Sequence, residues 1–281
     1  MGQVSKRIKQ AQARPFLKWA GGKKQLLPEL LPRIPKTFDR YFEPFIGGGA
    51  LFFALQPQQA ILSDINPDLI NLYQVIKADV ESLIQDLKQH RHEKDYFYKL
   101  RSIDRTKAYK SWSPVSKASR LIYLNKTCFN GLFRVNSKGQ FNTPFGSYKN
   151  PTIVDEANLR ACSAALQTTQ IRLRSFELIL EDAQAEDFVY FDPPYIPLSN
   201  TASFTGYSKS GFDMDMQVKL RDVCLALNER GTKLMVSNSS APLIFELYKD
   251  FQIDRVDATR SINSNGDQRG KIKEVIITSN Y

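Results

Sequence analysis

The sequence predicts an α/β protein with a mixed, mostly parallel sheet that is flanked by helices. Short apolar stretches that end on glycines or acids alternate with helical stretches, which is typical of parallel strands joined by helices. This alternation stops between residues 88 and 150 and resumes afterwards, so a second body is inserted into the α/β layer. The length of 281 residues allows one large domain or two smaller ones.

The first part of the α/β layer is expected before residue 90. Residues 41–55, YFEPFIGGGALFFAL, predict a short strand, a glycine turn and the start of a helix. Residues 59–66 predict the next strand, which ends on an acid. Apolar residues then recur at three-to-four spacing through residues 67–90, and Pro67 suits the first turn of the helix that this spacing predicts.

The insert carries all of the excess positive charge of the chain. Residues 88–150 contain 14 Lys and Arg but 3 Asp and Glu, whereas the whole chain has a net charge of +10. The insert is also rich in aromatic residues, and this combination is typical of a surface that binds a polyanion. A helix is expected from about residue 116 to 125, followed by a hairpin or loop platform in residues 129–148.

The alternating pattern returns after residue 150. In chain order we expect a helix at 155–167, strands at 169–176 and within 187–195, a helix at 213–231, a strand at 232–239, a helix at 241–250, and strands at 251–259 and 271–281. Gly231 is the expected stop of the long helix before it. The last two strands are expected to form an antiparallel hairpin, because the link between them is short.

Composition excludes several classes of protein. No apolar run approaches the length of a membrane span, and the polar, basic N-terminal arm lacks the apolar core of a secretory signal. Three scattered cysteines argue against a disulfide framework or a zinc site, so we expect no metal and a reducing, cytoplasmic setting. The two histidines, His90 and His92, stand in a polar stretch where we expect them to be solvated.

A glycine turn and an acid suggest a nucleotide site. Residues 45–50, FIGGGA, follow the first expected strand, and glycines let a backbone approach a ligand closely. Asp64 ends the next strand, where an acid can accept both hydroxyls of a ribose. The three contiguous glycines fail the dinucleotide pattern but remain compatible with an adenosine-bearing cofactor. A plain turn, with Asp64 as a helix cap, is the structural alternative. Upstream, Trp19 in FLKWAGGK is either a core residue or part of a second loop over the same ligand.

The stretch VYFDPPYIPL indicates a site for an amino group. Val189 to Phe191 are expected to carry Asp192 to the carboxyl edge of the sheet, where ligands of such sheets bind. Prolines lack an N–H donor and fix φ, so the Asp192 carboxylate and the Pro193 carbonyl form a stiff pair of acceptors. Tyr195 adds a flat ring beside them. This array suits a planar ring with an NH2 group, although an ordinary strand-ending turn is the structural alternative.

Together these motifs resemble the DNA N6-adenine methyltransferases of the Dam type, the D12 class. The resemblance rests on DPPY, FLKWAGGK, EPFIGGGALF and SDIN, and extends through the insert to PLSNTASFTGY and RSINSNG. It implies a Rossmann-like methyltransferase core with an inserted helical and hairpin DNA-recognition domain, S-adenosylmethionine as cofactor and double-stranded DNA as partner. The implied parts are a loose arm at 1–13, a catalytic domain at 14–70 and 151–281, and a target-recognition domain at 71–150.

The resemblance also implies roles for individual residues. The catalytic residues would be Asp192, Pro193 and Tyr195, which would hold a flipped adenine while its N6 attacks the methyl group. The cofactor residues would be Trp19, Lys23, Phe45, Gly47, Gly49, Asp64, Phe176 and Asp192. The DNA-binding residues would be Lys18, Phe129, Asn130, Leu132, Arg134, Asn136, Pro144 and Lys149. Among the latter, Phe129 and Asn130 would assist base extrusion and Arg134 would read a guanine.

Several alternatives stay open at this point. The retained NGLFR and PFGSY stretches indicate the recognition sequence GATC. An amino methyltransferase that acts on RNA or on a protein glutamine is the first alternative, and a DNA-binding protein with a relic cofactor domain is the second. The sequence does not distinguish an orphan methylase from the partner of a restriction enzyme. We expect a monomer without a membrane partner, in the bacterial cytoplasm or nucleoid.

Overall fold

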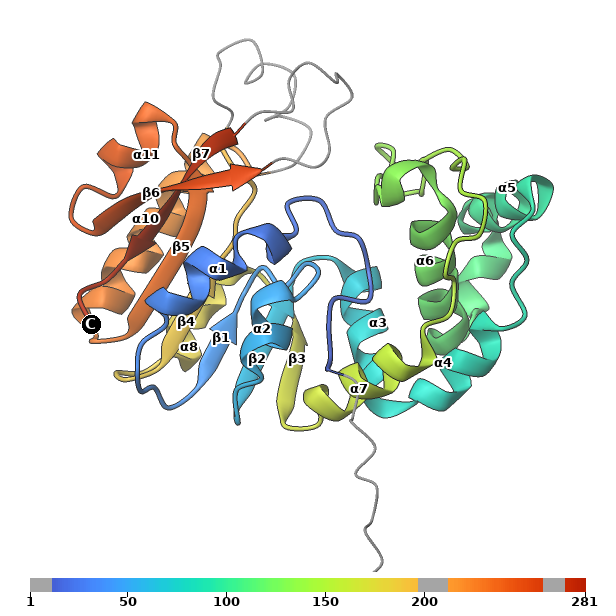
Figure 1. The fold of residues 1–281 in the computed structure, drawn as a ribbon, viewed down its shortest axis with the longest axis horizontal. Coiled ribbons are helices and arrows are strands. Elements are labelled where there is room, and N and C mark those ends of the chain that lie inside the picture. Colours follow the sequence, from blue (N-terminus) through green and yellow to red (C-terminus); the bar gives the residue numbers. More distant parts are fainter. Residues whose placement is uncertain (1–11, 197–211, 260–270) are drawn as a thin grey trace, which may run out of the picture. The chain divides into compact units, whose positions relative to one another are not determined.

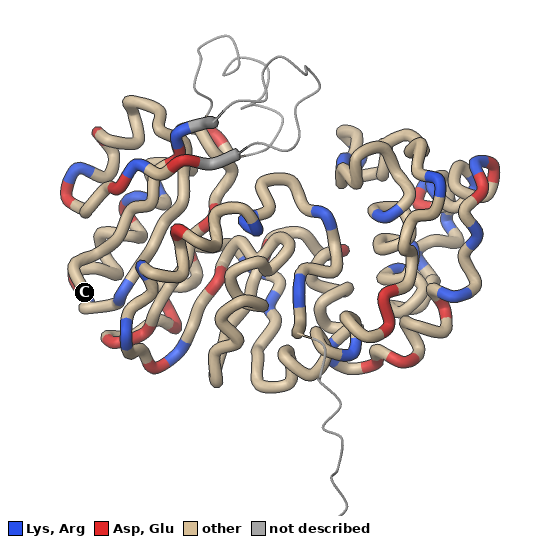
Figure 2. The backbone as a smooth tube through the Cα atoms, viewed as in Figure 1, with Lys and Arg blue, Asp and Glu red and all other residues tan. Residues whose placement is uncertain are grey.

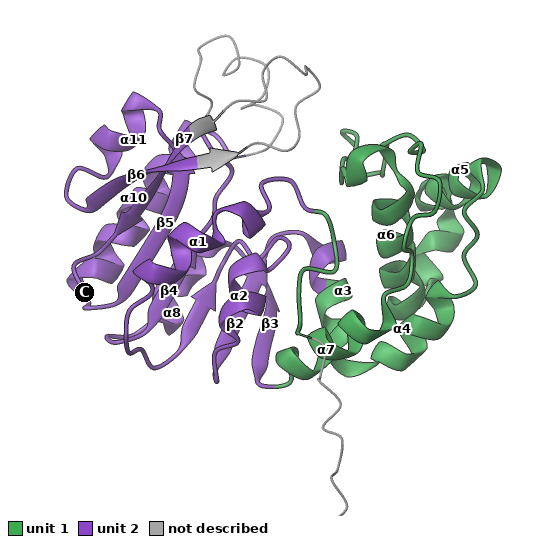
Figure 3. Ribbon diagram, in the orientation of Figure 1, with its two compact units in different colours: residues 1–18, 71–167 green, residues 19–70, 168–281 purple. Residues whose placement is uncertain are grey.

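The computed structural model describes residues 12–196, 212–259 and 271–281 of the chain. Most of the N-terminal arm and the stretches PLSNTASFTGY and RSINSNG therefore lie outside the described residues. The chain divides into two compact units (Figure 3). The first unit joins Met1–Lys18 to Asn71–Gln167, and the second joins Trp19–Ile70 to Thr168–Tyr281. This division reflects packing, and the functional domain boundaries stay a prediction.

The second unit is built on one mixed sheet (Figure 1). Seven strands of the described residues have the spatial order β3-β2-β1-β4-β5-β7-β6. Their bounds are β1 Tyr41–Glu43, β2 Ala60–Asp64, β3 Thr169–Leu173, β4 Phe188–Phe191, β5 Lys233–Ser239, β6 Gln252–Thr259 and β7 Lys271–Thr278. The first five strands pair in parallel, whereas β7 pairs antiparallel with both β5 and β6. The predicted fold class and the closing hairpin are thus confirmed.

Helices and short 3-10 turns (η) flank this sheet. Their bounds are η1 Lys23–Gln25, α1 Leu27–Leu30, η2 Leu31–Arg33, α2 Ala50–Leu55, η6 Phe176–Leu178, α8 Ile179–Asp182, α10 Met214–Glu229 and α11 Pro242–Leu247. The expected helix at 213–231 is confirmed as α10. The Asp213 side chain caps its first turn, because it accepts the Met216 N–H at 3.1 Å. Gly231, with a φ of +84°, follows its end.

Apolar residues from the strands and helices form the main core of the second unit. Phe42, Val189 and Val236 come from three neighbouring strands and are at most 1% exposed, so the sheet is apolar through its centre. The expected strand at 169–176 is too long: β3 ends at Leu173, and Phe176 instead begins η6. Phe176 is 3% exposed, and its ring stacks on the ring of Phe45 instead of extending strand β3.

The first unit is helical. Its elements are α4 Val80–Leu87, α5 Lys94–Ser102, η3 Ile103–Arg105, η4 Lys107–Ser111, α6 Pro114–Thr127, η5 Phe129–Gly131 and α7 Glu156–Leu166, while α3, Pro67–Ala78, runs across the boundary of the units. The single helix expected at 67–90 is wrong. The Asp79 side chain accepts the Ser82 N–H at 3.3 Å, so it caps a new helix after α3 has ended.

The core of the first unit is aromatic, and it corrects the expectation for the histidines. Nδ1 of His90 lies 2.7 Å from the Tyr96 hydroxyl and Nε2 lies 2.9 Å from Oγ of Ser119. Burial lowers the pKa of His90 against a smaller opposing effect of Asp86. The ring of His92 packs 5.0 Å from that of Phe145. The expectation of solvated histidines is therefore wrong, since both rings contribute to packing.

A buried ion pair ties the long loop after α6 to the helices of the first unit. The Arg120 and Asp104 side chains are 6% and 8% exposed and lie 2.8 Å apart. The same Asp104 oxygen accepts the backbone N–H of Phe141 at 2.8 Å, and Arg105 donates to the Phe141 carbonyl at 3.2 Å. The backbone around Phe141 is thereby held on both its polar groups.

We predict that Asp104→Ala destabilises the first unit strongly. The substitution leaves the Arg120 guanidinium buried without its counter-charge and the Phe141 N–H without its acceptor, so the free energy of unfolding should fall by about 3–5 kcal/mol. Urea denaturation followed by far-UV circular dichroism measures the change. Glu81→Ala is the matched control, because its ion pair with Arg160 at 2.6 Å is exposed and should contribute little. Equal stability of the two variants would contradict the prediction.

Candidate functional site

The carboxyl ends of the parallel strands gather acidic groups at one edge of the sheet. Glu43 is the last residue of β1, Asp64 is the last residue of β2, and Asp192 directly follows β4. Since β1, β2 and β4 run parallel, these three side chains belong to the same edge of the second unit. Ligands of open α/β sheets bind at such an edge.

Asp192 is held by a lysine and a hydroxyl chain. Nζ of Lys23, in η1, lies 2.7 Å from Oδ1 of Asp192, and the two side chains are 8% and 18% exposed. Oγ of Ser237 donates to the same oxygen at 2.8 Å. Because Ser237 has one hydroxyl hydrogen, Tyr190 is the donor in the 3.0 Å contact between their oxygens. Burial raises the pKa of Asp192, and the attraction to Lys23 opposes that shift.

The rest of the DPPY corner is fixed from three other elements. The Tyr195 hydroxyl donates to Oε2 of Glu274 on β7 at 3.0 Å, and Nζ of Lys23 lies 4.5 Å from the centre of the Tyr195 ring. The Gln217 side chain, on α10, donates to the Pro194 carbonyl at 2.9 Å. No donor contacts the Pro193 carbonyl within the described ranges. The role of this corner in binding an amino group stays a prediction.

The glycine loop brings Trp19 and Asp64 together. Gly47 has a φ of +45°, and a Cβ at this position would lie 2.8 Å from Cδ1 of Trp19, so a side chain does not fit. The Gly47 N–H donates to Oδ2 of Asp64 at 3.4 Å and the Asn66 N–H donates to Oδ1 at 2.9 Å. Burial raises the pKa of Asp64, and these backbone donors oppose the rise. Gly49, with a φ of +65°, directly precedes α2 as its N-cap residue.

Three aromatic rings pack together beside the glycines of this loop. Phe45 and Phe176 stack with their ring centres 5.3 Å apart, and Phe212 meets Phe45 at 5.6 Å. Phe45 is half-buried, whereas Phe176 lies in the core. The residues expected around the cofactor, Trp19, Lys23, Phe45, Gly47, Gly49, Asp64, Phe176 and Asp192, all belong to the second unit. Their roles stay predictions.

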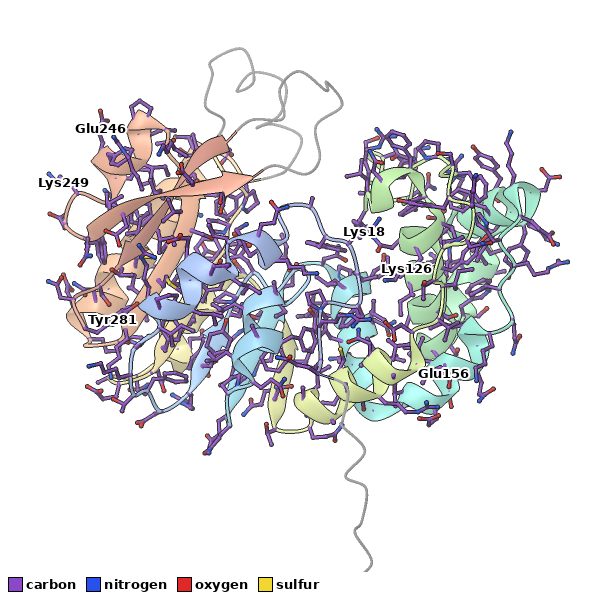
Figure 4. All side chains as sticks on the ribbon, viewed as in Figure 1. Lys18, Lys126, Glu156, Glu246, Lys249 and Tyr281 are labelled. Carbon is purple, nitrogen blue, oxygen red and sulfur yellow. The ribbon has the colours of Figure 1, made fainter. Side chains whose placement is uncertain are left out.

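The residues expected to bind DNA all belong to the first unit. Lys18 lies against Gly131, where a Cβ would come within 2.5 Å of the Lys18 side chain, and its Nζ lies 3.3 Å from the Tyr148 hydroxyl. Figure 4 labels Lys18 and Lys126, and Figure 2 shows the Lys and Arg of this unit in blue. Lys149 and Pro144 are exposed and Leu132 is half-buried.

The loop after α6 exposes an aromatic ring. The Phe129 side chain is 49% exposed although its backbone N–H donates to the Pro144 carbonyl at 2.9 Å. Asn130 next to it has a φ of +55°, a left-handed conformation that few residues other than glycine adopt. Single bridges between Cys128 and Phe145 and between Val135 and Phe141 close the loop. A hairpin or loop platform was expected here, and the structure shows a loop closed by two bridges.

Arg134 is exposed but oriented. Its Nε donates to Oδ1 of Asn142 at 2.7 Å and one terminal nitrogen donates to the Asn142 carbonyl at 3.3 Å. The Asn142 N–H returns a bond to the Arg134 carbonyl at 2.9 Å. Asn136 is used differently, because its side chain bonds Gln140 and the Lys138 N–H within its own turn. A guanidinium held at its inner edge presents its outer edge to a ligand.

Sequence reasoning missed several residues that orient the expected ones. Ser237, Gln217 and Glu274 approach the DPPY corner from β5, α10 and β7, and no local signal marks them. Glu43 had a signal, since it ends an apolar strand as Asp64 does. Its side chain is 3% exposed, and the Tyr41 hydroxyl donates to its Oε2 at 2.6 Å.

The described residues hold no group of three or more His, Cys, Asp and Glu side chains arranged to bind a metal ion. No helix among them combines the length and the apolar character that crossing a bilayer requires.

Comparison with known proteins assigns the family. Residues 19–262 match the family of D12 class N6 adenine-specific DNA methyltransferases. The chain is 49% identical over 270 residues to the type II methyltransferase M1.LlaDCHI of Lactococcus lactis subsp. cremoris, with 95% of each chain covered. It is 44% identical to the type II methyltransferase M.MjaIII of Methanocaldococcus jannaschii (96% and 100% covered) and 36% identical to the DNA adenine methylase of Escherichia coli K12 (94% of each). The resemblance seen in the sequence is confirmed: the chain belongs to the family of D12 class N6 adenine-specific DNA methyltransferases.

Proposed function

We propose that this enzyme moves a methyl group from S-adenosylmethionine to the N6 of an adenine that is flipped out of double-stranded DNA, at GATC. The observation that carries the proposal is the corner at Asp192. A buried strand ends there on a carboxylate held by Lys23 and Ser237, beside a proline carbonyl that no described donor contacts and an oriented tyrosine ring. An enzyme that acts on DNA would be located in the compartment that holds the chromosome.

The residues at the glycine loop fit an adenosine-bearing cofactor. Both oxygens of Asp64 accept backbone N–H groups, which orient the carboxylate, and its remaining lone pairs would accept ribose hydroxyls. The loop shows positive φ at Gly47 and Gly49, so its backbone is free of side chains at those points. When bound, S-adenosylmethionine supplies a methyl group on a positively charged sulfur. Trp19, Phe45 and Phe176 would surround the adenosine, and Lys23 would hold Asp192 in place.

Asp192, Pro193 and Tyr195 would bind the target base. The Asp192 carboxylate and the Pro193 carbonyl accept the two hydrogens of an amino group, and the Tyr195 ring stacks against the base. Lys23 lies over one face of that ring, so the base would use the other face. Acceptors that are fixed before the base arrives need no rearrangement during the reaction. Such preorganisation can lower the activation free energy by roughly several kcal/mol.

The loop after α6 would extrude and read the DNA. Phe129 presents a half-exposed ring that can fill the place of a base, and Asn130 next to it can pair with the base left behind. Arg134 would donate two hydrogen bonds to a guanine, and Lys18, Leu132 and Pro144 would contact neighbouring bases. Asn136 and Lys149 would lie along the phosphates, with Asn136 acting by its backbone turn as well as by its side chain.

The substrate is tested by incubating the protein with a labelled methyl donor and four acceptors. We predict label on the adenine of a GATC duplex, and little label on a duplex with one changed base pair, on RNA or on protein. Each wrong base pair should lower the specificity constant by an amount equivalent to about 1–3 kcal/mol. Label on RNA or on a protein glutamine, with none on DNA adenine, would overturn the substrate assignment.

The cofactor site is tested by Asp64→Ala. We predict at least tenfold weaker binding of S-adenosylmethionine, because two charge-assisted hydrogen bonds to the ribose are lost, at about 1.5–3 kcal/mol each. Isothermal titration calorimetry without DNA measures the affinity. Asp222→Ala is the control, since Asp222 is an exposed acid on α10 that pairs with Arg221. Unchanged affinity of Asp64→Ala would reject the assignment.

Base reading is tested by comparing three variants. Arg134→Ala should lose about 1–3 kcal/mol of discrimination at one base pair, and Asn142→Ala should lose part of the same discrimination because it no longer orients Arg134. Lys149→Ala should instead weaken binding to every sequence and reduce the dependence of affinity on salt. Binding assays on matched duplexes at several salt concentrations separate the two effects. Equal losses on all sequences for Arg134→Ala would refute its reading role.

A further inference from the structure

Glu43 is a buried acid beside the candidate active site. It ends β1 and is 3% exposed, and its hydrogen-bond partners are neutral: the Tyr41 hydroxyl at 2.6 Å and a backbone N–H of Phe52. Among the described residues no Lys or Arg forms an ion pair with it. A buried carboxylate without a counter-ion is costly, and such a group commonly takes up a proton.

Lys23, whose positive charge acts on Glu43, is already engaged. Lys23 pairs with Asp192 at 2.7 Å and donates to the Gly21 carbonyl at 2.5 Å, and its ammonium lies over the Tyr195 ring. The charges of Lys23 and of Asp192 both act on Glu43, so one ammonium influences two buried carboxyl groups. If both were ionised, they would compete for the same positive charge, and the contact that orients Asp192 would loosen.

We propose that Glu43 is a positioning residue that stays protonated in the folded enzyme and so leaves the charge of Lys23 undivided for Asp192. Tyr41 and Glu43 lie two residues apart on β1, so their side chains point to the same side of the sheet. Tyr41 pairs with Phe188 on β4, and Tyr190 and Asp192 follow Phe188 at intervals of two residues, so they belong to that same side. The neutral acid fills a polar position on this side without adding a second negative charge.

The electrostatic surroundings of Glu43 agree with this assignment. Burial raises its pKa from 4.5 to about 8, and the negative charge of Asp192 adds to the rise. The hydrogen bonds from Tyr41 and Phe52 and the charge of Lys23 lower it by less. Tyr190, on β4, also faces this group, and burial keeps the pKa of its hydroxyl well above 10, so it brings no charge at neutral pH.

The protonation of Glu43 is tested by stability, without DNA or cofactor. Because its pKa is raised in the folded state, the unfolded chain releases the proton first, and stability is lost as pH rises from about 4.5 to about 8. Glu43→Gln copies the neutral acid and should escape this loss. We expect its melting temperature relative to wild type to rise by roughly 8–15 °C between pH 5 and pH 8.5.

The control is Glu246→Gln, an exposed acid on α11 that Figure 4 labels, which should follow the wild type at every pH. A melting difference between Glu43→Gln and wild type that is independent of pH, or that favours the wild type as pH rises, would overturn the proposal. Should Glu43→Gln not fold, the infrared band of a protonated carboxylic acid in glutamate-labelled wild type at pH 7 decides the same question. Its absence would overturn the proposal.

The effect on turnover rests on the proposed function. Between pH 7 and pH 9 the protonated fraction of a group with a pKa near 8 falls about tenfold. The ratio of turnover at pH 9 to that at pH 7 should therefore be higher in Glu43→Gln than in wild type, by up to about tenfold. Equal ratios would overturn the positioning role. A wild-type protein without methyl transfer to DNA would overturn the proposed function instead, and the stability measurement would still decide the protonation.

Discussion

The ion pair between Lys23 and Asp192 is the interaction on which the candidate active site depends. It joins a turn near the start of the chain to the residue that follows β4, and both side chains are largely shielded from water. Lys23 also lies over the Tyr195 ring, so one ammonium fixes the acid and limits the position of the aromatic group. Around this single charge, the remaining acids must be neutral or have partners of their own.

In the first unit, too, one charged group serves two partners. Asp104 neutralises Arg120 and at the same time accepts the Phe141 N–H, so one carboxylate stabilises the helices and fixes the loop that follows α6. Phe129 and Arg134 are among the exposed residues of that loop, and Arg134 is already oriented by Asn142. Rigid support beneath exposed groups is what a surface needs if it must recognise a shape that changes little.

The sequence predicted the sheet and its acidic edge because both depend on local patterns. An apolar strand that ends on Asp64 or Asp192 is visible in a few residues, and parallel order then brings the ends together. The break between α3 and α4 at Asp79 was missed, because apolar spacing continues across it and only a cap marks the change. The burial of His90 depends on Tyr96 and on Ser119, which is 29 residues away. Ser237 and Glu274 were missed for the same reason, since only the folded sheet brings them to the DPPY corner.

The two tryptophans of the chain fall one in each unit. Trp19 contacts the glycine loop of the second unit, and Trp112 lies near Tyr109 in the first. Both are partly accessible to solvent, so the fluorescence of each responds to its own surroundings. With Trp112 replaced by phenylalanine, the remaining indole would report on the glycine loop alone, and with Trp19 replaced it would report on the helical unit. The order in which two different ligands engage the enzyme could then be timed without any attached dye.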